Sequence, residues 1–187
     1  MSKKQNHRWV PGSPAPLIRP HSLAKHRVVE SYLKRYVQTL TSNPRRPLLK
    51  LTVVDGFAGG GQYRDSITND FRPGSPLIAL NSMAFAGEQA QSLRKNQFNL
   101  DVEYFFIEKN RDAFSYLQTT LRESDFKPMV GDKITLLQSN LQDQIDPIIA
   151  KIRARGGGER AIFLLDQFGF ASVDFPMIRN ILSLTAL

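Results

Sequence analysis

The sequence predicts an α/β fold in which helices flank a parallel β-sheet. Four apolar segments rich in β-formers alternate with amphipathic segments of helical period, the order typical of a parallel sheet. A loop with four glycines follows the first of these strands, residues 48–55. Each strand also ends at a polar residue, and the four are Asp55, Glu108, Asn140 and Asp166.

Composition limits the classes of protein that fit. The chain has 187 residues, which suits a single hydrophobic core, and no cysteine, which excludes disulfides and thiolate metal sites. This fits a reducing compartment, so we expect a cytoplasmic protein. The apolar runs have the length of strands, and we expect neither a membrane span nor a signal peptide.

Positive charge is concentrated near the amino terminus. Residues 1–50 carry eleven Lys and Arg and one acid, a net charge of +10, so the remainder of the +8 chain carries −2. A basic segment beside a nearly neutral domain suits contact with a nucleic acid backbone, or serves only as a solubilising tail.

Two regions are expected before the first strand. Residues 1–21 contain Pro11, Pro14, Pro16 and Pro20 and are predicted to form an irregular basic arm, while residues 22–187 form the domain. Trp9 either anchors the arm on the domain or stacks on a base. Ser22 is a candidate N-cap for a helix over about 23–41, whose apolar face is Val28, Val29, Tyr32, Leu33, Val37 and Leu40. The three histidines of this region have no second ligand at metal-binding spacing, so no metal site is expected.

The later elements follow in order. Residues 62–73 look polar and irregular, and a helix capped by Ser75 with Pro76 at its first position should end by Asn99, with a break possible near Gly87. A strand over 102–108 leads to a helix capped by Asn110, and a strand over 133–138 leads to a helix that ends at Gly156. The last strand covers 161–166, and Asp174 caps a final helix with Phe175, Ile178, Ile181 and Leu182 facing inward.

The polar strand ends predict a binding site, because ligands of such sheets lie across the carboxyl ends of the strands. Glu108 suits two ribose hydroxyls, and Asn140 suits the edge of an adenine. Asp55 and the amides near Gly59 and Gly61 suit the amino-acid end of a cofactor, and Asp166 then faces the substrate. The plain alternative is a strand followed by an ordinary glycine-rich turn.

A dinucleotide site fits this loop less well. The fingerprint G-x-G-x-x-G begins at Gly59 and Gly61, but Arg64 stands where the third glycine belongs. What remains is Asp55-x-Phe57-x-Gly59-x-Gly61, which resembles the first motif of class I S-adenosylmethionine-dependent methyltransferases. A dinucleotide-dependent oxidoreductase stays as an alternative.

Longer motifs resemble the three-Cys-motif partner family, a group of methyltransferase-like bacterial proteins. The matching stretches lie between residues 23 and 182 and are Lys25-His26, Tyr32-Leu33, Val54 to Tyr63, Gly74 to Leu80, Phe106-Ile107-Glu108 and Phe163 to Gly169. The resemblance implies a Rossmann-like class I methyltransferase fold that binds S-adenosylmethionine through Asp55, Gly56, Phe57, Gly59, Gly61, Glu108 and Asn140. It also implies a protein partner, a neighbouring three-cysteine protein.

The resemblance further implies the chemistry at the last strand. Asp166 to Gly169 is similar to the Asp-Pro-Pro-Tyr motif of methyltransferases that act on amines of nucleic acid bases, with Asp166 holding the amine and Phe168 stacking on the base. Gln167 stands where family members commonly have proline, and Phe168 is equally suited to the core. A complete sheet of this class has seven strands and four are expected here, so we expect an incomplete fold. A non-catalytic partner protein is the other interpretation.

Overall fold

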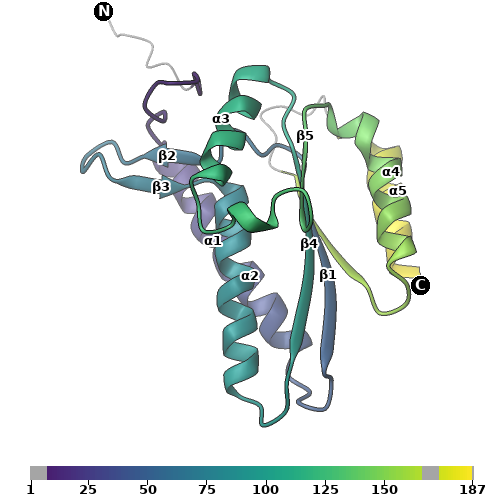
Figure 1. Cartoon of the computed structure of the whole chain (residues 1–187). Coiled ribbons are helices and arrows are strands. Elements are labelled where there is room, and N and C mark those ends of the chain that lie inside the picture. The colour runs from purple at the N-terminus through teal and green to yellow at the C-terminus, as the bar shows by residue number, and fades with distance from the viewer. Residues whose placement is uncertain (1–7, 166–172, 187) are drawn as a thin grey trace, which may run out of the picture.

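The computed structural model describes residues 8–165 and 173–186 and contains a four-stranded parallel sheet. Its strands stand in the order β5–β4–β1–β6, with bounds Ile134–Leu137, Asn99–Ile107, Leu48–Asp55 and Arg160–Leu164. Figure 1 shows helices on both faces of this sheet. The predicted α/β fold with a parallel sheet flanked by helices is therefore confirmed.

Each face of the sheet has its own layer of helices (Figure 1). One layer is α1 (Pro20–Leu40), α2 (Ser75–Ser92) and α3 (Arg111–Arg122), and the other is α4 (Leu141–Ala154) and α5 (Phe175–Leu182). Short 3-10 turns, η1 (Lys127–Met129) and η2 (Ser183–Ala186), follow α3 and α5.

Strand β1 is buried on both faces and separates two hydrophobic clusters. Leu51 and Val53 belong to the cluster under α1, α2 and α3, and Val54 belongs to the cluster under α4 and α5. This division follows from the two-residue period of a strand. It explains why the segment is continuously apolar rather than alternating.

Strand β1 is also the point where the strand order reverses. The second and third strands of this sheet, β4 and β5, lie on one side of it, and β6 lies on the other. Asp55 is paired in register with Phe106 of β4 and with Leu164 of β6. The carboxyl ends of three strands therefore meet around Asp55, where ligands bind in sheets of this kind.

Two helix starts differ from the prediction by one to three residues. Helix α1 begins at Pro20 with Arg19 as N-cap, because proline fits a first turn whose N–H groups lack helical acceptors. Helix α2 begins at Ser75 with Gly74 as N-cap, and it runs unbroken through Gly87.

The segment predicted to be irregular, residues 62–73, forms an antiparallel hairpin. Its strands are β2 (Gln62–Arg64) and β3 (Phe71–Pro73), and Asp65 closes the turn by accepting hydrogen bonds from the N–H groups of Ile67 and Thr68. The prediction missed it because three-residue strands of mostly polar residues show no period. From here, residues 8–19 of the arm are called the strap.

The strap is irregular, as predicted, but it is packed on the domain. Ile18 donates its N–H to the carbonyl of Arg64 at 2.8 Å, and Arg64 donates to the carbonyl of Pro16 at 3.0 Å. Ala15 and Ile18 are both buried. The strap thus extends the hairpin by a short parallel bridge, Leu17 to Arg64.

The inward face predicted for the last helix is wrong at three of four positions. Phe175, Ile178 and Leu182 are 76%, 39% and 59% exposed, whereas Met177 is buried and Ile181 packs on the α4 cluster. Asp174 caps the helix as predicted, accepting from the N–H of Met177 at 2.9 Å.

The same correction applies to part of α1. Val28 and Tyr32 are 68% and 53% exposed, and Leu33 and Val37 form the buried face. Over the described ranges, 8–165 and 173–186, no helix combines the length and apolar character that crossing a membrane would need.

Candidate functional site

The glycine loop, residues 56–61, is held by backbone hydrogen bonds to several elements. The N–H of Gly56 donates to the carbonyl of Leu164 at 3.0 Å, and the N–H of Ala58 donates to the carbonyl of Ile107 at 2.9 Å. The hydroxyl of Thr120 on α3 donates to the carbonyl of Gly60 at 3.0 Å. The loop is therefore a fixed part of the sheet edge.

Asp55 and Glu108 top neighbouring parallel strands, as the sequence predicted. Asp55 is 2% exposed, and its Oδ1 accepts the N–H of Phe57 at 3.1 Å. Glu108 follows β4, and its two oxygens accept the N–H groups of Gly59 at 2.9 Å and Asn110 at 2.6 Å. The carboxylate of Glu108 thus joins the glycine loop to the start of α3.

A cavity of about 690 Å³ opens at these strand ends. Six predicted residues line it together, and they are Asp55, Gly56, Phe57, Gly59, Glu108 and Asn140. Its volume lies within the range of small-molecule sites, about 300–1,000 Å³. The sequence prediction therefore located residues that share one cavity.

Of the predicted cofactor-binding residues, all of which the structure describes, Gly61 does not line the cavity. Its φ of +81° is in the left-handed region, and a Cβ there would lie 2.8 Å from Leu117 of α3. Its carbonyl accepts the N–H of Gly74 at 2.8 Å, next to the start of α2. Glycine at 61 is therefore explained by the packing of the loop.

Asn140 serves as the N-cap position of α4, although its side chain makes no capping hydrogen bond. Its Nδ2 donates to Asp143 at 3.4 Å, and the residue is exposed at the cavity. The other predicted pair, Asp166 and Phe168, lies outside the described residues, as does Gln167.

Trp9 covers the glycine loop. A Cβ on Gly60 would lie 2.1 Å from Cδ1 of the indole, and one on Gly59 would lie 2.6 Å from Cη2. The indole Nε1 donates to the carbonyl of Gln62 at 2.8 Å. The indole therefore occupies the space that a side chain at position 59 or 60 would need. Trp9 anchors the strap on the domain in this way.

The cavity is also lined by residues that sequence reasoning did not assign to the cofactor site. Trp9, Tyr63 and His26 form a row of rings, with centroids 5.1 Å and 5.7 Å apart, and all three line the cavity. Lys25 and Ser22 of α1 line the cavity as well. Lys25, His26 and Tyr63 stand within the motifs of the family resemblance, and that was the available signal.

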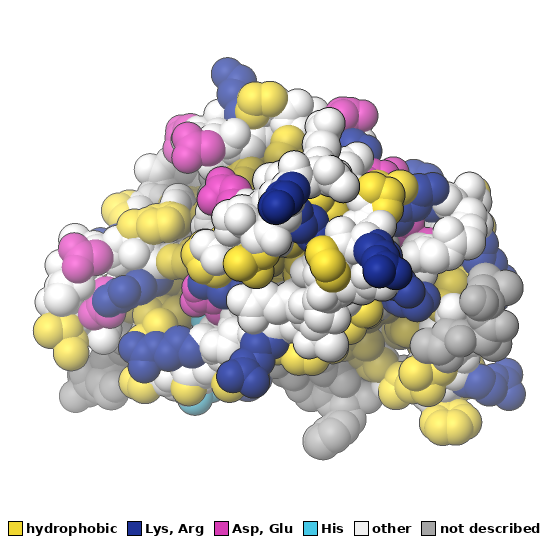
Figure 2. Space-filling view, turned by 90° about the horizontal axis from the view of Figure 1, so that it is seen from below, with side chains coloured by type: hydrophobic (Ala, Val, Ile, Leu, Met, Phe, Trp, Pro, Cys, Tyr) yellow, Lys and Arg dark blue, Asp and Glu magenta, His cyan; other side chains and the backbone are white. Residues whose placement is uncertain are grey.

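The basic residues of the first fifty positions do not gather in one place. Lys25 lines the cavity, Lys34 pairs with Glu30 at 2.6 Å, and Arg45 and Arg46 precede β1 at the opposite end of the sheet. Figure 2, which views the molecule from below Figure 1, shows Lys and Arg side chains spread over that face with Asp and Glu among them.

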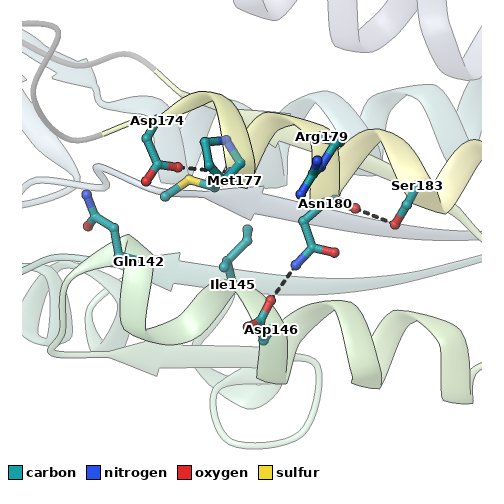
Figure 3. Close-up of a pocket in the computed structure, with 9 residues that line it drawn as sticks. Gln142, Ile145, Asp146, Asp174, Met177, Arg179, Asn180 and Ser183 are labelled. Atoms are coloured by element: carbon teal, nitrogen blue, oxygen red, sulfur yellow. Dashed lines mark hydrogen bonds between the residues drawn. The ribbon is translucent and has the colours of Figure 1, made fainter.

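A second cavity of about 590 Å³ lies between α4 and α5 (Figure 3). Asp146 of α4 accepts a hydrogen bond from Asn180 of α5, and Ser183 donates to the carbonyl of Asn180 at 2.6 Å. It contains none of the predicted cofactor-binding residues. In the part of the chain that the structure describes, no group of His, Asp and Glu could hold a metal ion.

Comparison with known proteins finds distant structural likeness. No family model and no curated protein matches the chain. Among solved structures, the DUF519 protein LPL1258 from Legionella pneumophila is similar over 66% of this chain at 12% identity and a TM-score of 0.41. The chain spans about half, 51%, of that protein. At this identity and TM-score the likeness carries no inference about activity.

Proposed function

We propose that the cavity at the carboxyl ends of β1 and β4 binds S-adenosylmethionine and that the protein is methyltransferase-like, in keeping with its resemblance to the three-Cys-motif partner family. One observation carries the proposal. Asp55 and Glu108, at the ends of neighbouring parallel strands, line one cavity with Gly59 of the glycine loop.

The carboxylates and the amide that line the cavity suit the polar groups of this cofactor. A carboxylate has about four lone-pair sites, and each oxygen of Glu108 uses one for a backbone N–H, so both can accept a ribose hydroxyl. Asp55, which is buried and lines the cavity, suits an ammonium group, which needs a charged acceptor when it leaves water. Asn140 can both donate to and accept from an adenine edge.

When bound, S-adenosylmethionine supplies a methyl group on a sulfonium, which leaves as a neutral thioether. The work left to the protein is then to hold the acceptor amine in line with that methyl group and to exclude water. The resemblance assigns the acceptor side to Asp166 and Phe168. The acceptor we propose is an amine of a nucleic acid base, with basic residues of the amino-terminal region in contact with the phosphates. We also propose that the protein is cytoplasmic and that a three-cysteine protein is its partner.

A non-catalytic partner protein is the second candidate, and a specific observation favours it. The N–H of Gly59 is bonded to Glu108, and Trp9 covers Gly59 and Gly60, so part of the loop is occupied by the protein itself. Such a protein keeps the fold and the cofactor and works through interaction.

Incubation with S-adenosylmethionine labelled in its methyl group, together with separate DNA, RNA and protein substrates, separates the two candidates. The methyltransferase proposal expects label in nucleic acid and its loss in Asp166→Ala, with cofactor binding retained. Cofactor binding with no label in any substrate favours the interaction protein. A parallel titration with NAD tests the dinucleotide alternative.

A further inference from the structure

One face of α1 carries cations and aromatic rings at the surface of the molecule. Residues three or four apart share a face of a helix, and the set at this spacing, from here called the α1 stripe, is Lys25, Val28, Tyr32, Arg35 and Tyr36. Val28 and Tyr32 are 68% and 53% exposed, Lys25 and Arg35 are exposed, and Tyr36 is partly buried. The one acid of α1, Glu30, pairs with Lys34 outside the stripe. The α1 stripe is therefore positive and partly aromatic.

The two tyrosines of the α1 stripe stack on each other. Their ring centroids are 5.9 Å apart, with an angle of 30° between the ring planes. Burial raises the pKa of Tyr36, Tyr32 raises it further, and the positive charge of Arg160 at the start of β6 lowers it. Arg160 therefore lies near enough to act on the hydroxyl of Tyr36, and it adds a cation at this end of the stripe.

The cations near the two tyrosines differ from their neighbour Lys34. Among residues 8–165 and 173–186, the exposed side chains of Arg35 and Arg160 make no ion pair. Lys34 pairs with Glu30 at 2.6 Å, and its Nζ lies 4.8 Å from the ring centroid of Phe85 on α2. Arg35 can therefore meet an anion from outside the protein, whereas Lys34 is held toward α2.

The α1 stripe begins at the cavity. Lys25, its first residue, lines the cavity together with Asp55 and Glu108. Arg35 follows ten positions later, which is roughly 15 Å along a helix that rises 1.5 Å per residue. An extended chain that lay along the stripe would therefore have one end at the cavity.

We propose that the α1 stripe binds single-stranded nucleic acid, with an unpaired base stacked on Tyr32 and phosphates beside Arg35 and Arg160. The inference rests on the proposed function for its choice of partner, because that function takes a nucleic acid base as the methyl acceptor. It adds the surface that holds the strand and the requirement for unpaired bases. Exposed rings beside cations bind single strands because every base has a face that can stack and every nucleotide carries a phosphate. In a duplex those faces are covered by neighbouring base pairs, so Tyr32 gives no contact of this kind.

Fluorescence anisotropy of the full chain with labelled oligonucleotides of mixed sequence tests the role of Tyr32. The probes are single-stranded DNA, single-stranded RNA and duplex DNA, so that the two single strands identify the sugar. We expect one or both single strands to bind more tightly than the duplex. Tyr32→Ala should weaken single-strand binding about 5- to 100-fold, the range for one stacked base. Tyr32→Phe keeps the ring and should bind like the wild type.

Arg35→Met and Lys34→Met form a matched pair, because each removes one positive charge from adjacent positions of α1. Arg35→Met should weaken single-strand binding and reduce the slope of log K against log salt concentration by about 0.7, the value for one phosphate contact of a single strand. Lys34→Met should leave that slope unchanged. Circular dichroism checks that all variants fold.

The outcomes separate this inference from the proposed cofactor site. No loss in Tyr32→Ala, equal losses in Arg35→Met and Lys34→Met, or tighter binding of the duplex overturns the inference. Failure of every oligonucleotide to bind also overturns it and leaves this face of α1 to a protein partner. Because the oligonucleotides are titrated without cofactor, binding through the α1 stripe by a protein that does not bind S-adenosylmethionine supports this inference and overturns the cofactor site. Binding of S-adenosylmethionine without binding of any oligonucleotide overturns this inference and leaves the cofactor site standing.

Discussion

The indole of Trp9 lies against the α-carbon of Gly60, so closely that a methyl group on Gly60 would stand 2.1 Å from the ring. Fifty-one positions separate the two residues in the sequence. The contact joins the strap to the loop that follows β1. It also requires glycine at position 60, whether or not a ligand is bound. Its energetic weight can be measured directly.

Gly60→Ala is predicted to destabilise the protein by about 1–3 kcal/mol, because the added methyl group must displace the indole. The same substitution in a Trp9→Ala background should cost clearly less, since the obstructing ring is gone. Denaturant unfolding of the four proteins in this double-mutant cycle gives the coupling. Equal costs in the two backgrounds would show that the indole does not rest on the loop in solution.

Arg155, just after α4, is predicted to be the most sensitive charged residue at the other end of the sheet. It bonds Asp101 at 2.8 Å, Thr52 at 3.1 Å and the carbonyl of Leu51 at 3.0 Å, and it lies 3.2 Å from Glu159. Its side chain is only 11% exposed. Arg155→Met should cost about 3–5 kcal/mol, because it leaves the buried carboxylate of Glu159 without its cation and takes one of two cations from Asp101.

Lys133 provides the matched comparison for Arg155. It also pairs with Asp101 at 2.8 Å, but its side chain is 39% exposed. Lys133→Met should therefore cost about 1 kcal/mol or less. Similar losses for the two variants, measured by urea unfolding, would contradict the importance given to burial.

Stability should fall in acid through Asp101. Burial alone would raise the pKa of Asp101, but hydrogen bonds from Lys133 and Arg155 and the charge of Arg155 hold that pKa below its ordinary value of 3.8. The stabilisation is present above this value and is lost as the pH falls through the lower pKa of the folded protein. Asp101→Asn should flatten the acid side of a plot of unfolding free energy against pH.

Glu159 should act in the opposite direction. Burial raises the pKa of Glu159 above its ordinary value of 4.5, although Thr52 and Arg155 oppose the shift. Its charged form is therefore disfavoured on folding, and its contribution becomes more favourable as the pH falls through the raised pKa toward 4.5. Glu159→Gln should remove a pH dependence whose sign is opposite to that removed by Asp101→Asn. Slopes of the same sign would contradict this.

The parallel sheet could be predicted because its signals are local. The run through Val53 and Val54 is apolar on both faces, and the caps at Asn110 and Asp174 make the side-chain bonds that their residue types favour. The carboxyl ends of parallel strands share one edge of a sheet. The polar residues Asp55 and Glu108 could therefore be brought together without a structure.

The remainder depends on contacts between distant segments. No local signal shows that Trp9 rests on Gly60, and only the motifs of the family resemblance pointed to Lys25 of α1, which lines the cavity. The face of α5 was misjudged because helical period alone does not show which side meets α4. That side carries Met177, and Phe175 is exposed.

Calorimetry with S-adenosylmethionine, comparing wild type, Asp55→Ala and Glu108→Gln, tests the central claim most directly. We predict saturable binding of one molecule by the wild type. Binding should be abolished in Asp55→Ala and weakened about tenfold or more in Glu108→Gln, because each loses a charged acceptor. Circular dichroism should confirm that both variants fold. Unchanged affinity in a folded Asp55→Ala protein would contradict the assignment of this cavity as the cofactor site.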